Sequence, residues 1–185
     1  HIGIFRQVTP DTTEKGILEA QVRVDKHAAD VEEFYKRYSR GLWDVKVRGF
    51  VMAGDDNPNP PNYARADVDK FMAENDMDGF EPNYFHIHGG WSSGYCGLGN
   101  IGGNRSVTFL LYACGLKTMI HEIGHNLGLH HASTLKGETL VEYGDDTSVM
   151  GSTQYVSGFN SVDLVRLGLE FDSEIKRVVE TEQIL

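Results

Sequence analysis

The sequence predicts an α/β (α+β) fold, in which a twisted mixed sheet packs against helices. One observation supports this class, and a second bounds the number of domains. In the first two-thirds of the chain, segments with the apolar pattern of strands alternate with segments of helical periodicity. With 185 residues, of which 40% are hydrophobic, the chain is long enough to bury a core and has the size of one domain. We therefore expect residues 1–185 to form a single domain.

Apolar spacing marks the first two strands and the helix between them. Residues 2–8 predict a short strand, and residues 43–54 predict a second, largely buried one. Between them, a helix from about Asp25 to Ser39 is predicted by apolar residues at intervals of three and four: Val24, Ala28, Val31, Phe34, Tyr35 and Tyr38. Residues 17–24 fit either an extension of this helix or a further strand. Residues 54–62 contain three prolines and predict a loop.

The middle of the chain predicts a helix followed by strands. Residues 63–75 read as helical, and Gly79 can end that helix or turn the chain. The segment YFHIH, residues 84–88, predicts a strand. The glycine-rich residues 94–104 suit an exposed edge strand with bulges. The apolar residues 107–113 then lead into a further helix.

Charge and hydropathy exclude two classes of partner. The chain has 17 basic and 27 acidic residues, a net charge of −10, which disfavours nucleic acid and anionic membranes. The longest apolar run, residues 107–116, is far shorter than the ~20 residues of a membrane span. The chain begins without methionine or a signal pattern, so we expect any signal or pro-segment to have been removed. We expect a monomer.

The two cysteines leave two possibilities open. Cys96 and Cys114 form a disulfide if the protein is exported, or remain separate buried thiols if it is not.

The segment HEIGHNLGLHH, residues 121–131, predicts a catalytic metal site. His121 and His125 are four residues apart and therefore project side by side from one face of a helix. Glu122 lies about 100° around the helix, where it can reach a water at the metal without itself binding the metal. An ordinary histidine-bearing helix would explain the i,i+4 pair, but not the five motif positions filled together.

Gly128 explains how a third histidine reaches the same metal. On a continuous helix His131 would lie about 15 Å along the axis from His121, so the helix must end and turn back. Glycine at position 128 can adopt the positive φ of such an end. Three neutral imidazoles leave the fourth position of one tetrahedral Zn²⁺ open, as catalytic sites require. We expect His130 to point elsewhere.

This extended motif resembles that of the metzincin zinc endopeptidases. The segment Ser148-Val149-Met150-Gly151 looks like their Met-turn, with Met150 as an apolar floor beneath the metal. The stretch EYGDDTSVMG, residues 142–151, is similar to the gametolysin family of that clan. The resemblance implies an upper lobe of residues 1–131 that ends in the active-site helix. It also implies a small irregular lower lobe of residues 132–185, with the cleft between the two.

One position departs from related enzymes. Astacin-like and serralysin-like metzincins carry a tyrosine two residues after the turn methionine, where this chain has Ser152. Tyr143 and Tyr155 are candidates for that role by proximity in the sequence.

These observations predict a secreted or extracellular zinc metalloendopeptidase that hydrolyses peptide bonds of protein substrates. Glu122 is expected to act as general base on a water that the zinc activates. An extended substrate would add to the edge strand, and the residues expected to bind it are Gly99, Asn100, Ile101 and Tyr155. Residues 152–159 are expected to line the pocket for the side chain after the cut. The alternative is a catalytically silent zinc-binding module for adhesion or regulation on a protease fold.

Three further groups are weaker candidates for metal binding. His86 and His88 share one face of a predicted strand and form half of a second metal site, or else face solvent or the cleft. The sequence resembles the start of a calcium-binding loop at Glu74, Asp76, Asp78 and Gly79. The position that should supply the bidentate glutamate of such a loop is occupied by Phe85. Residues 55–57 and Asp145-Asp146 offer oxygen ligands, so Ca²⁺ stays open as a second cofactor.

Overall fold

A computed structural model describes residues 1–53, 65–77, 79–80, 83–88, 94–108, 114–152 and 157–169. In chain order its elements are β1 (Ile2–Val8), α1 (Glu14–Tyr38), β2 (Val47–Ala53), α2 (Arg65–Glu74), β3 (Tyr84–His88), β4 (Gly97–Gly99), β5 (Arg105–Thr108), α3 (Leu116–Asn126), β6 (Thr134–Lys136), β7 (Thr139–Val141) and α4 (Ser161–Arg166).

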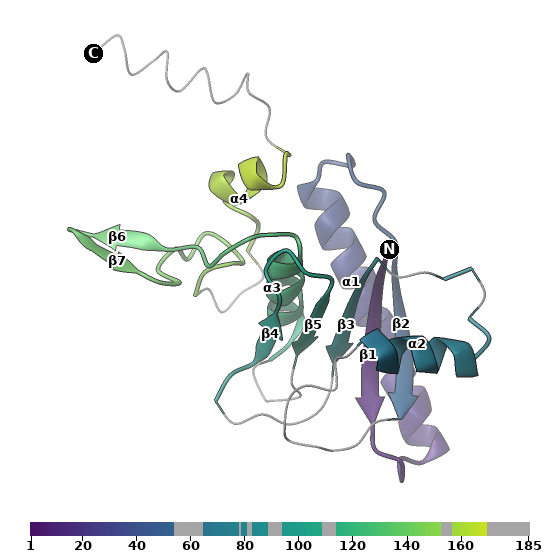
Figure 1. The fold of residues 1–185 in the computed structure, drawn as a ribbon. Coiled ribbons are helices and arrows are strands. Elements are labelled where there is room, and N and C mark those ends of the chain that lie inside the picture. Colours follow the sequence, from purple (N-terminus) through teal and green to yellow (C-terminus); the bar gives the residue numbers. More distant parts are fainter. Residues whose placement is uncertain are drawn as a thin grey trace.

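Five of these strands form one twisted sheet in the order β2-β1-β3-β5-β4 (Figure 1). The strands β2, β1, β3 and β5 are parallel, and β4 pairs with β5 in the antiparallel direction at the edge. The sheet is therefore mixed, which confirms the predicted fold class.

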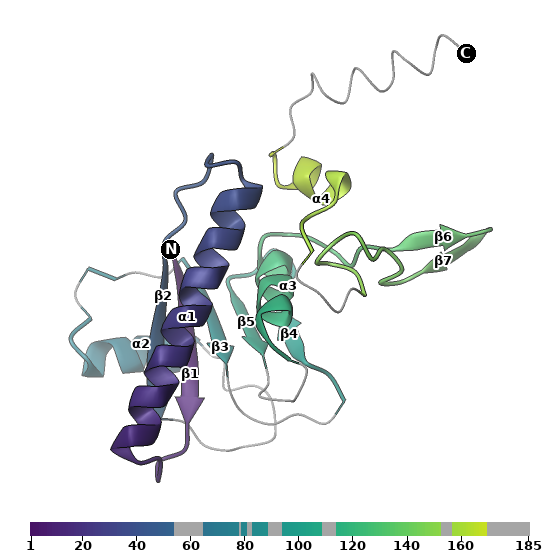
Figure 2. The same ribbon diagram turned by 180° about the vertical axis from the view of Figure 1, so that it is seen from behind.

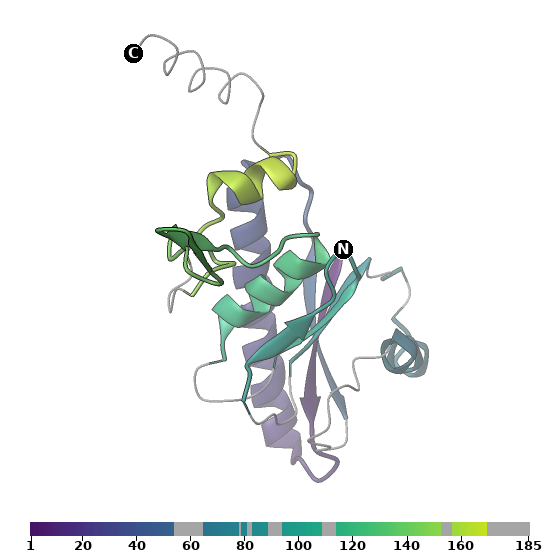
Figure 3. The same ribbon diagram turned by 60° about the vertical axis from the view of Figure 1, so that its left-hand side comes forward.

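Helices cover both faces of the sheet. The helices α1 and α3 lie on one face and α2 lies on the other (Figures 2 and 3). Side chains alternate along β1 accordingly: Ile2 and Ile4 belong to the core under α1 and α3, whereas Phe5 belongs to the core on the α2 side. The α1 side of the sheet is therefore the side that supports α3 and its histidines.

Helix α1 is longer than predicted and settles the alternative left open for residues 17–24. It begins after Thr13, whose side chain accepts a hydrogen bond from the Gly16 amide, and continues through residues 17–24 without interruption. Ala20 and Val24 face the core, whereas Leu18 and Val22 are exposed. Apolar residues on the solvent face blur the helical period, which is why the sequence fitted both a helix and a strand.

The strands β1 and β3 have the predicted bounds, whereas β2, α2 and β4 lie inside their predicted segments with shorter bounds, and β5 begins two residues before the predicted apolar segment. β2 begins at Val47, and Val45 packs against the core just before it. β4 is only three residues long, because residues 101–104 form the turn into β5. The predicted loop at residues 54–62 and the apolar residues 109–113 lie outside the described residues.

Cys96 and Cys114 form a disulfide, which settles the second open alternative. The bond joins the start of β4 to the residue that precedes α3 by two positions. It therefore ties the edge strand to the helix that carries the motif. None of the described helices combines the length and apolar character that a membrane crossing needs.

After His131 the described residues add no strand to the five-stranded sheet. The chain forms the two-stranded β6–β7 hairpin, and then a loop that leads into α4 (Figure 1). The loop returns to α3: the Val149 carbonyl is 2.9 Å from His121 Nδ1, and the Ala132 amide donates to the Met150 carbonyl. This irregular segment therefore forms the second wall of the site.

Candidate metal centre

Helix α3 places His121 and His125 side by side. Their ring centroids are 4.7 Å apart, and both side chains are buried. The helix ends at Asn126, and Gly128 follows with φ +93°. The Gly128 amide donates to the His125 carbonyl, and the Leu129 amide donates to the Gly124 carbonyl. These bonds close the helix end, as expected of glycine in the left-handed region.

The turn at Gly128 brings His131 to the other two histidines. One nitrogen from each of His121, His125 and His131 lies within 4.8 Å of the others, and we call these three residues the histidine cluster. His130 is exposed and lies outside this cluster. The structure thus assembles the three predicted ligands at one point.

Each ring of the cluster is held through its Nδ1 atom. His121 Nδ1 is 2.9 Å from the Val149 carbonyl, and His125 Nδ1 is 2.8 Å from the Leu129 carbonyl. His131 Nδ1 is 2.6 Å from Glu142 Oε1. With Nδ1 donating to an oxygen, Nε2 of each ring is the nitrogen left for a metal, as in many zinc sites.

Burial favours the neutral forms of His121 and His125. It lowers the pKa of His121 to about 3 and also lowers the pKa of His125; in both cases a hydrogen bond to a backbone carbonyl acts in the opposite direction. Neutral imidazole is the form that binds metal. The donor set of three anchored imidazoles therefore fits Zn²⁺ with an open coordination position.

Glu122 is buried beside the cluster, against the edge strand. Burial raises its pKa to about 8, and Lys117 acts against this rise. A Cβ atom on Gly97 would lie 2.6 Å from Glu122 Oε1, and one on Gly99 would lie 2.5 Å from the Glu122 carbonyl oxygen. The two glycines of β4 therefore allow the strand to approach α3 closely.

The turn after β4 is bound to the end of α3. Asn126 Nδ2 donates to the carbonyls of Asn100 and Arg105, and the Gly102 amide donates to the His125 carbonyl. Ile101 is 52% exposed between these anchors. Of the residues expected to bind substrate, Gly99 faces α3, Asn100 and Ile101 lie in the anchored turn, and Tyr155 lies outside the described residues.

Met150 is fully buried against α3. A Cβ atom on Gly124 would lie 2.6 Å from Met150 Sδ, so glycine at this helical position makes room for the methionine. Lys117 Nζ donates to the Gly151 carbonyl at 3.1 Å and ties the same turn to the first part of the helix.

Tyr143 stacks on the histidine cluster. Its ring centroid lies 3.8 Å from that of His131 and 6.1 Å from that of His121. Its φ of 60° is in the left-handed region, which is unfavourable for an aromatic residue and is often found at functional sites. The Ser152 amide donates to the Tyr143 carbonyl and holds this loop against the turn that contains Met150.

Comparison with protein families supplies the deciding observation. The model of the gametolysin peptidase M11 family matches residues 68–172, more than half of the chain, and this range includes the histidine cluster, Glu122 and Met150. The chain belongs to the gametolysin peptidase family. The family predicted from the motif is therefore confirmed.

Solved structures similar to this gametolysin-family chain are distant in sequence. A chain in a chaperone–substrate complex has a TM-score of 0.56 at 14% identity and covers 91% of this chain and 33% of its own. Archaemetzincin from Methanopyrus kandleri has a TM-score of 0.49 at 16% identity, covering 91% and 94%. Metalloproteinase-II from Bacteroides fragilis has a TM-score of 0.44 at 11% identity, covering 90% and 52%. At 14% identity the first likeness shows a shared fold alone. No curated protein has significant sequence similarity to the chain.

His86 and His88 of the gametolysin-family chain face the core, so the expectation that they face solvent is wrong. His86 is fully buried, and its two ring nitrogens are each 2.7 Å from a hydroxyl, that of Ser106 and that of Thr108. Its hydrogen-bonding capacity is thereby used within the protein. Within the described ranges, the histidine cluster is the group of three or more ligand residues that is close enough to hold a metal.

The structure describes some of the candidate calcium ligands. Asp145 accepts hydrogen bonds from Thr147 and Asn160, so its carboxylate braces the loop before α4. Residues 55–57 and Asp78 lie outside the described residues.

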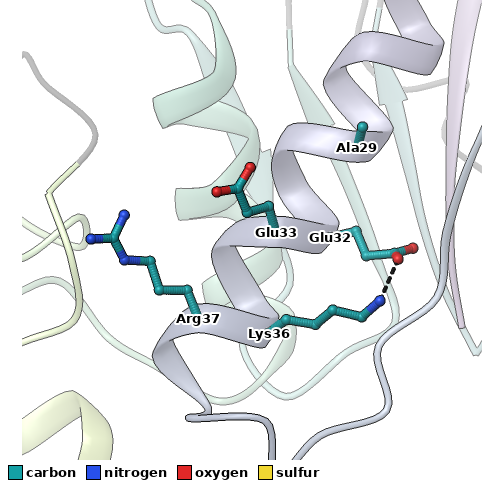
Figure 4. Close-up of a pocket in the computed structure, with 5 residues that line it drawn as sticks. All are labelled: Ala29, Glu32, Glu33, Lys36 and Arg37. Carbon is teal, nitrogen blue, oxygen red and sulfur yellow. Dashed lines mark hydrogen bonds and ion pairs between the residues drawn. The ribbon is translucent and has the colours of Figure 1, made fainter.

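A shallow hollow on the outer face of α1 contains none of the cluster residues. Its lining is Ala29, Glu32, Glu33, Lys36 and Arg37 (Figure 4). Glu32 and Lys36 form an i,i+4 ion pair across it at 2.5 Å. This is the solvated face of an amphipathic helix.

Sequence reasoning missed three residues that shape the centre: Lys117, Gly124 and Glu142. Glu142 begins the stretch that resembles the gametolysin family, and this position was the sequence feature that could have pointed to it. Gly124 was visible as an unfavourable residue within a helix. Lys117 gave no signal, because its partner is a backbone carbonyl 34 residues away.

Proposed function

We propose that this gametolysin-family chain is a zinc-dependent metalloendopeptidase that hydrolyses peptide bonds of protein substrates. One observation carries the proposal: three imidazoles anchored through Nδ1 converge beside a buried glutamate that neighbours the first of them. His121, His125 and His131 would hold one Zn²⁺. Bound zinc would supply Lewis acidity, polarising the scissile carbonyl and lowering the pKa of a water towards ~7.

Glu122 is the proposed general base. It accepts a proton from the attacking water as the water oxygen bonds to the carbonyl carbon. When the C–N bond breaks, it donates that proton to the leaving amine. Burial favours its protonated form and an adjacent cation would favour the carboxylate, so the site can both accept and return the proton.

Other residues position the substrate and the oxyanion. An extended substrate would pair with the open edge of β4, near Gly99, Asn100 and Ile101. Tyr143 is proposed to fill the role left open by Ser152, because its ring already lies on the cluster. Met150 would form the floor of a Met-turn. Tyr155 and residues 152–159 would line the pocket after the cut, between lobes of residues 1–131 and 132–185.

We propose that the enzyme is secreted and acts as a monomer. The disulfide between Cys96 and Cys114 supports an oxidising compartment. Calcium remains a second proposed cofactor on the chemistry of the acidic loops alone.

The test is a casein or gelatin assay of the wild type beside Glu122→Gln, each loaded with zinc. We expect the variant to lose activity by about 10²–10⁴-fold, the usual contribution of a positioned base, while zinc content stays unchanged. Glu138→Gln, an exposed residue in the β6–β7 turn, is the matched control and should leave the rate unchanged. Equal activity of wild type and Glu122→Gln would refute the mechanism.

The alternative from another class is a catalytically silent zinc-binding module for adhesion or regulation. It predicts zinc binding with no hydrolysis by the wild type. The buried carboxylate beside His121 argues against it, because a site that only binds metal has no need of a base there.

A further inference from the structure

A second group of nitrogen-bearing side chains lies under α1, apart from the histidine cluster. Arg6 on β1 stands opposite His88 on β3 in the parallel pair, and both project to the face that α1 covers. The ring of His27, from α1, lies 5.3 Å from the ring of His88. We call Arg6, His27 and His88 the arginine–histidine cluster.

Each of these three residues has a buried nitrogen without a hydrogen-bond partner: Arg6 Nε, His27 Nδ1 and His88 Nδ1. The His88 side chain is only 3% exposed, and the other two residues are half-buried. Unpartnered buried polar atoms are rare and costly, and here three occur together. The neighbouring His86 shows the contrast, because hydroxyl groups of β5 engage both of its nitrogens.

The charge around the cluster favours an anion over a cation. Arg6 carries a fixed positive charge and an Nε–H that can only donate. The negative charge of Asp30 raises the pKa of His27, but the Asp30 carboxylate is paired with Lys26 at 2.6 Å. Arg23 adds a further positive charge near Arg6, and its guanidinium also pairs with Glu19 at 4.0 Å. A metal ion would be repelled here, although the chain as a whole has a net charge of −10.

Position in the fold also suits a ligand. Arg6 and His88 lie towards the carboxyl ends of the parallel strands β1 and β3. In open α/β sheets, ligands commonly bind at this edge.

We propose that Arg6, His27 and His88 form a binding site for a small oxyanion, of the sulfate, phosphate or carboxylate type, that is separate from the zinc centre. The anion would accept hydrogen bonds from Arg6 Nε, His27 Nδ1 and His88 Nδ1. It would stabilise the packing of α1 on β1 and β3, with no part in the chemistry at Glu122.

The test uses the zinc-loaded chain and sodium sulfate, with sodium chloride at equal ionic strength as the reference. Sulfate should raise the midpoint of thermal unfolding by about 3 °C when it exceeds its Kd tenfold. It should also shift the side-chain nitrogen resonances of His27 and His88, and leave those of the histidine cluster in place. If neither signal responds to sulfate, the proposal is overturned.

Arg6→Met removes the fixed charge and should weaken sulfate binding at least tenfold. Arg48→Met is the matched control, because Arg48 is exposed on the opposite face of the same sheet, beside Phe80. His27→Gln serves if Arg6→Met fails to fold. Equal sulfate responses in all variants, or a response of His27 and His88 to added zinc in place of sulfate, would overturn the site.

Two further measurements characterise anion binding. Acetate in place of sulfate separates carboxylates from tetrahedral oxyanions, and a response to either supports the site. Sulfate binding should change little between pH 8 and 6.5, because burial lowers the pKa of both histidines and a neutral ring can still donate through Nδ1–H. The charged or titratable groups that face the two histidines are Arg6 of β1, Arg23, Lys26 and Asp30 of α1, and His86 of β3. If sulfate shifts the side-chain nitrogen resonances of His27 and His88 at neither pH, the histidines are excluded as ligands and the proposal is contradicted.

Discussion

Glycine at position 97 determines how closely the edge strand approaches Glu122. Any side chain there would meet Glu122 Oε1 at 2.6 Å and the Val107 carbonyl oxygen at 2.8 Å. The carboxylate can yield more easily than the backbone, so a larger residue would displace the proposed base. The absence of a Cβ atom at this position would thus affect the proposed chemistry without contacting substrate.

For Gly97→Ala we expect kcat to fall by about 10²-fold, because displacing a catalytic group by about 1 Å has an effect of that order. Zinc affinity should stay unchanged. Leu98→Ala is the control, since Leu98 is 39% exposed and points away from α3. Unchanged hydrolysis of casein by Gly97→Ala would show that Glu122 tolerates the extra methyl group.

Glu142 acts on the metal centre through His131. Its Oε1 atom is 2.6 Å from His131 Nδ1, so it orients the ring and raises the basicity of Nε2. His131 is the proposed ligand that comes from outside the helix, and its Nδ1 atom is held by a side chain, whereas the carbonyls of Val149 and Leu129 hold the other two. The third ligand therefore depends most on a side chain.

Glu142→Gln should lower zinc affinity by about 10- to 100-fold, the usual effect of losing such a partner. Competition with a chromogenic chelator measures the affinity directly. The exposed Glu138→Gln again serves as control. Equal affinities would mean that His131 is positioned by the turn at Gly128 alone.

Among the elements, α4 fixes the loop that contains Met150. Asp163 of α4 is buried and accepts a hydrogen bond from the Ser148 hydroxyl. The Ser148 hydroxyl oxygen in turn accepts a hydrogen bond from the Met150 amide. Asp163 and Asn160 also form a capping box at the start of the helix. A six-residue helix far from the sheet thereby sets the turn beneath α3.

Asp163→Ala should lower the free energy of unfolding by about 1–3 kcal/mol, because it leaves the buried Ser148 hydroxyl without its acceptor and removes half of the cap. Urea unfolding of wild type and variant measures the difference. Asp146→Ala, at an exposed position in the same loop, should change stability little. A loss no greater than that of Asp146→Ala would remove α4 from this role.

For the whole molecule, buried histidines on the α1 side of the sheet make stability depend on pH. Burial, together with the charges of Arg6 and His27, lowers the pKa of His88 to about 3, from 6.5 in an unfolded chain. Below pH 6.5 the unfolded chain therefore takes up a proton that the folded chain does not. The stability contributed by His88 is fully present above pH 6.5 and declines as the pH falls towards 3.

Replacing His88 by Asn should reduce the slope of unfolding free energy against pH between 6 and 4 by up to about 1.4 kcal/mol per unit. Urea titrations of wild type and His88→Asn in a buffer with chelator and without sulfate measure this slope. Parallel slopes would show that His88 becomes protonated in the folded state as readily as in the unfolded chain.

The sequence alone determined the spacing of His121, His125 and Glu122, the break at Gly128 that delivers His131, and the alternation of strands and helices. These features could be predicted because they depend on helical and strand periods within a few residues. The stretch 142–151 also carries the likeness to the gametolysin family in its residues alone.

Tertiary structure decided which distant groups meet. The approach of Gly97 to Glu122, the contact of Gly124 with Met150, and the contact of the His27 ring with the His88 ring all join segments whose relative position depends on strand register and helix packing. The same holds for residues 17–24, whose exposed apolar side chains conceal their helical period unless the sheet beneath them is in place. Local periodicity depends on neighbouring residues of the sequence, but contacts across the core depend on how all the elements pack together.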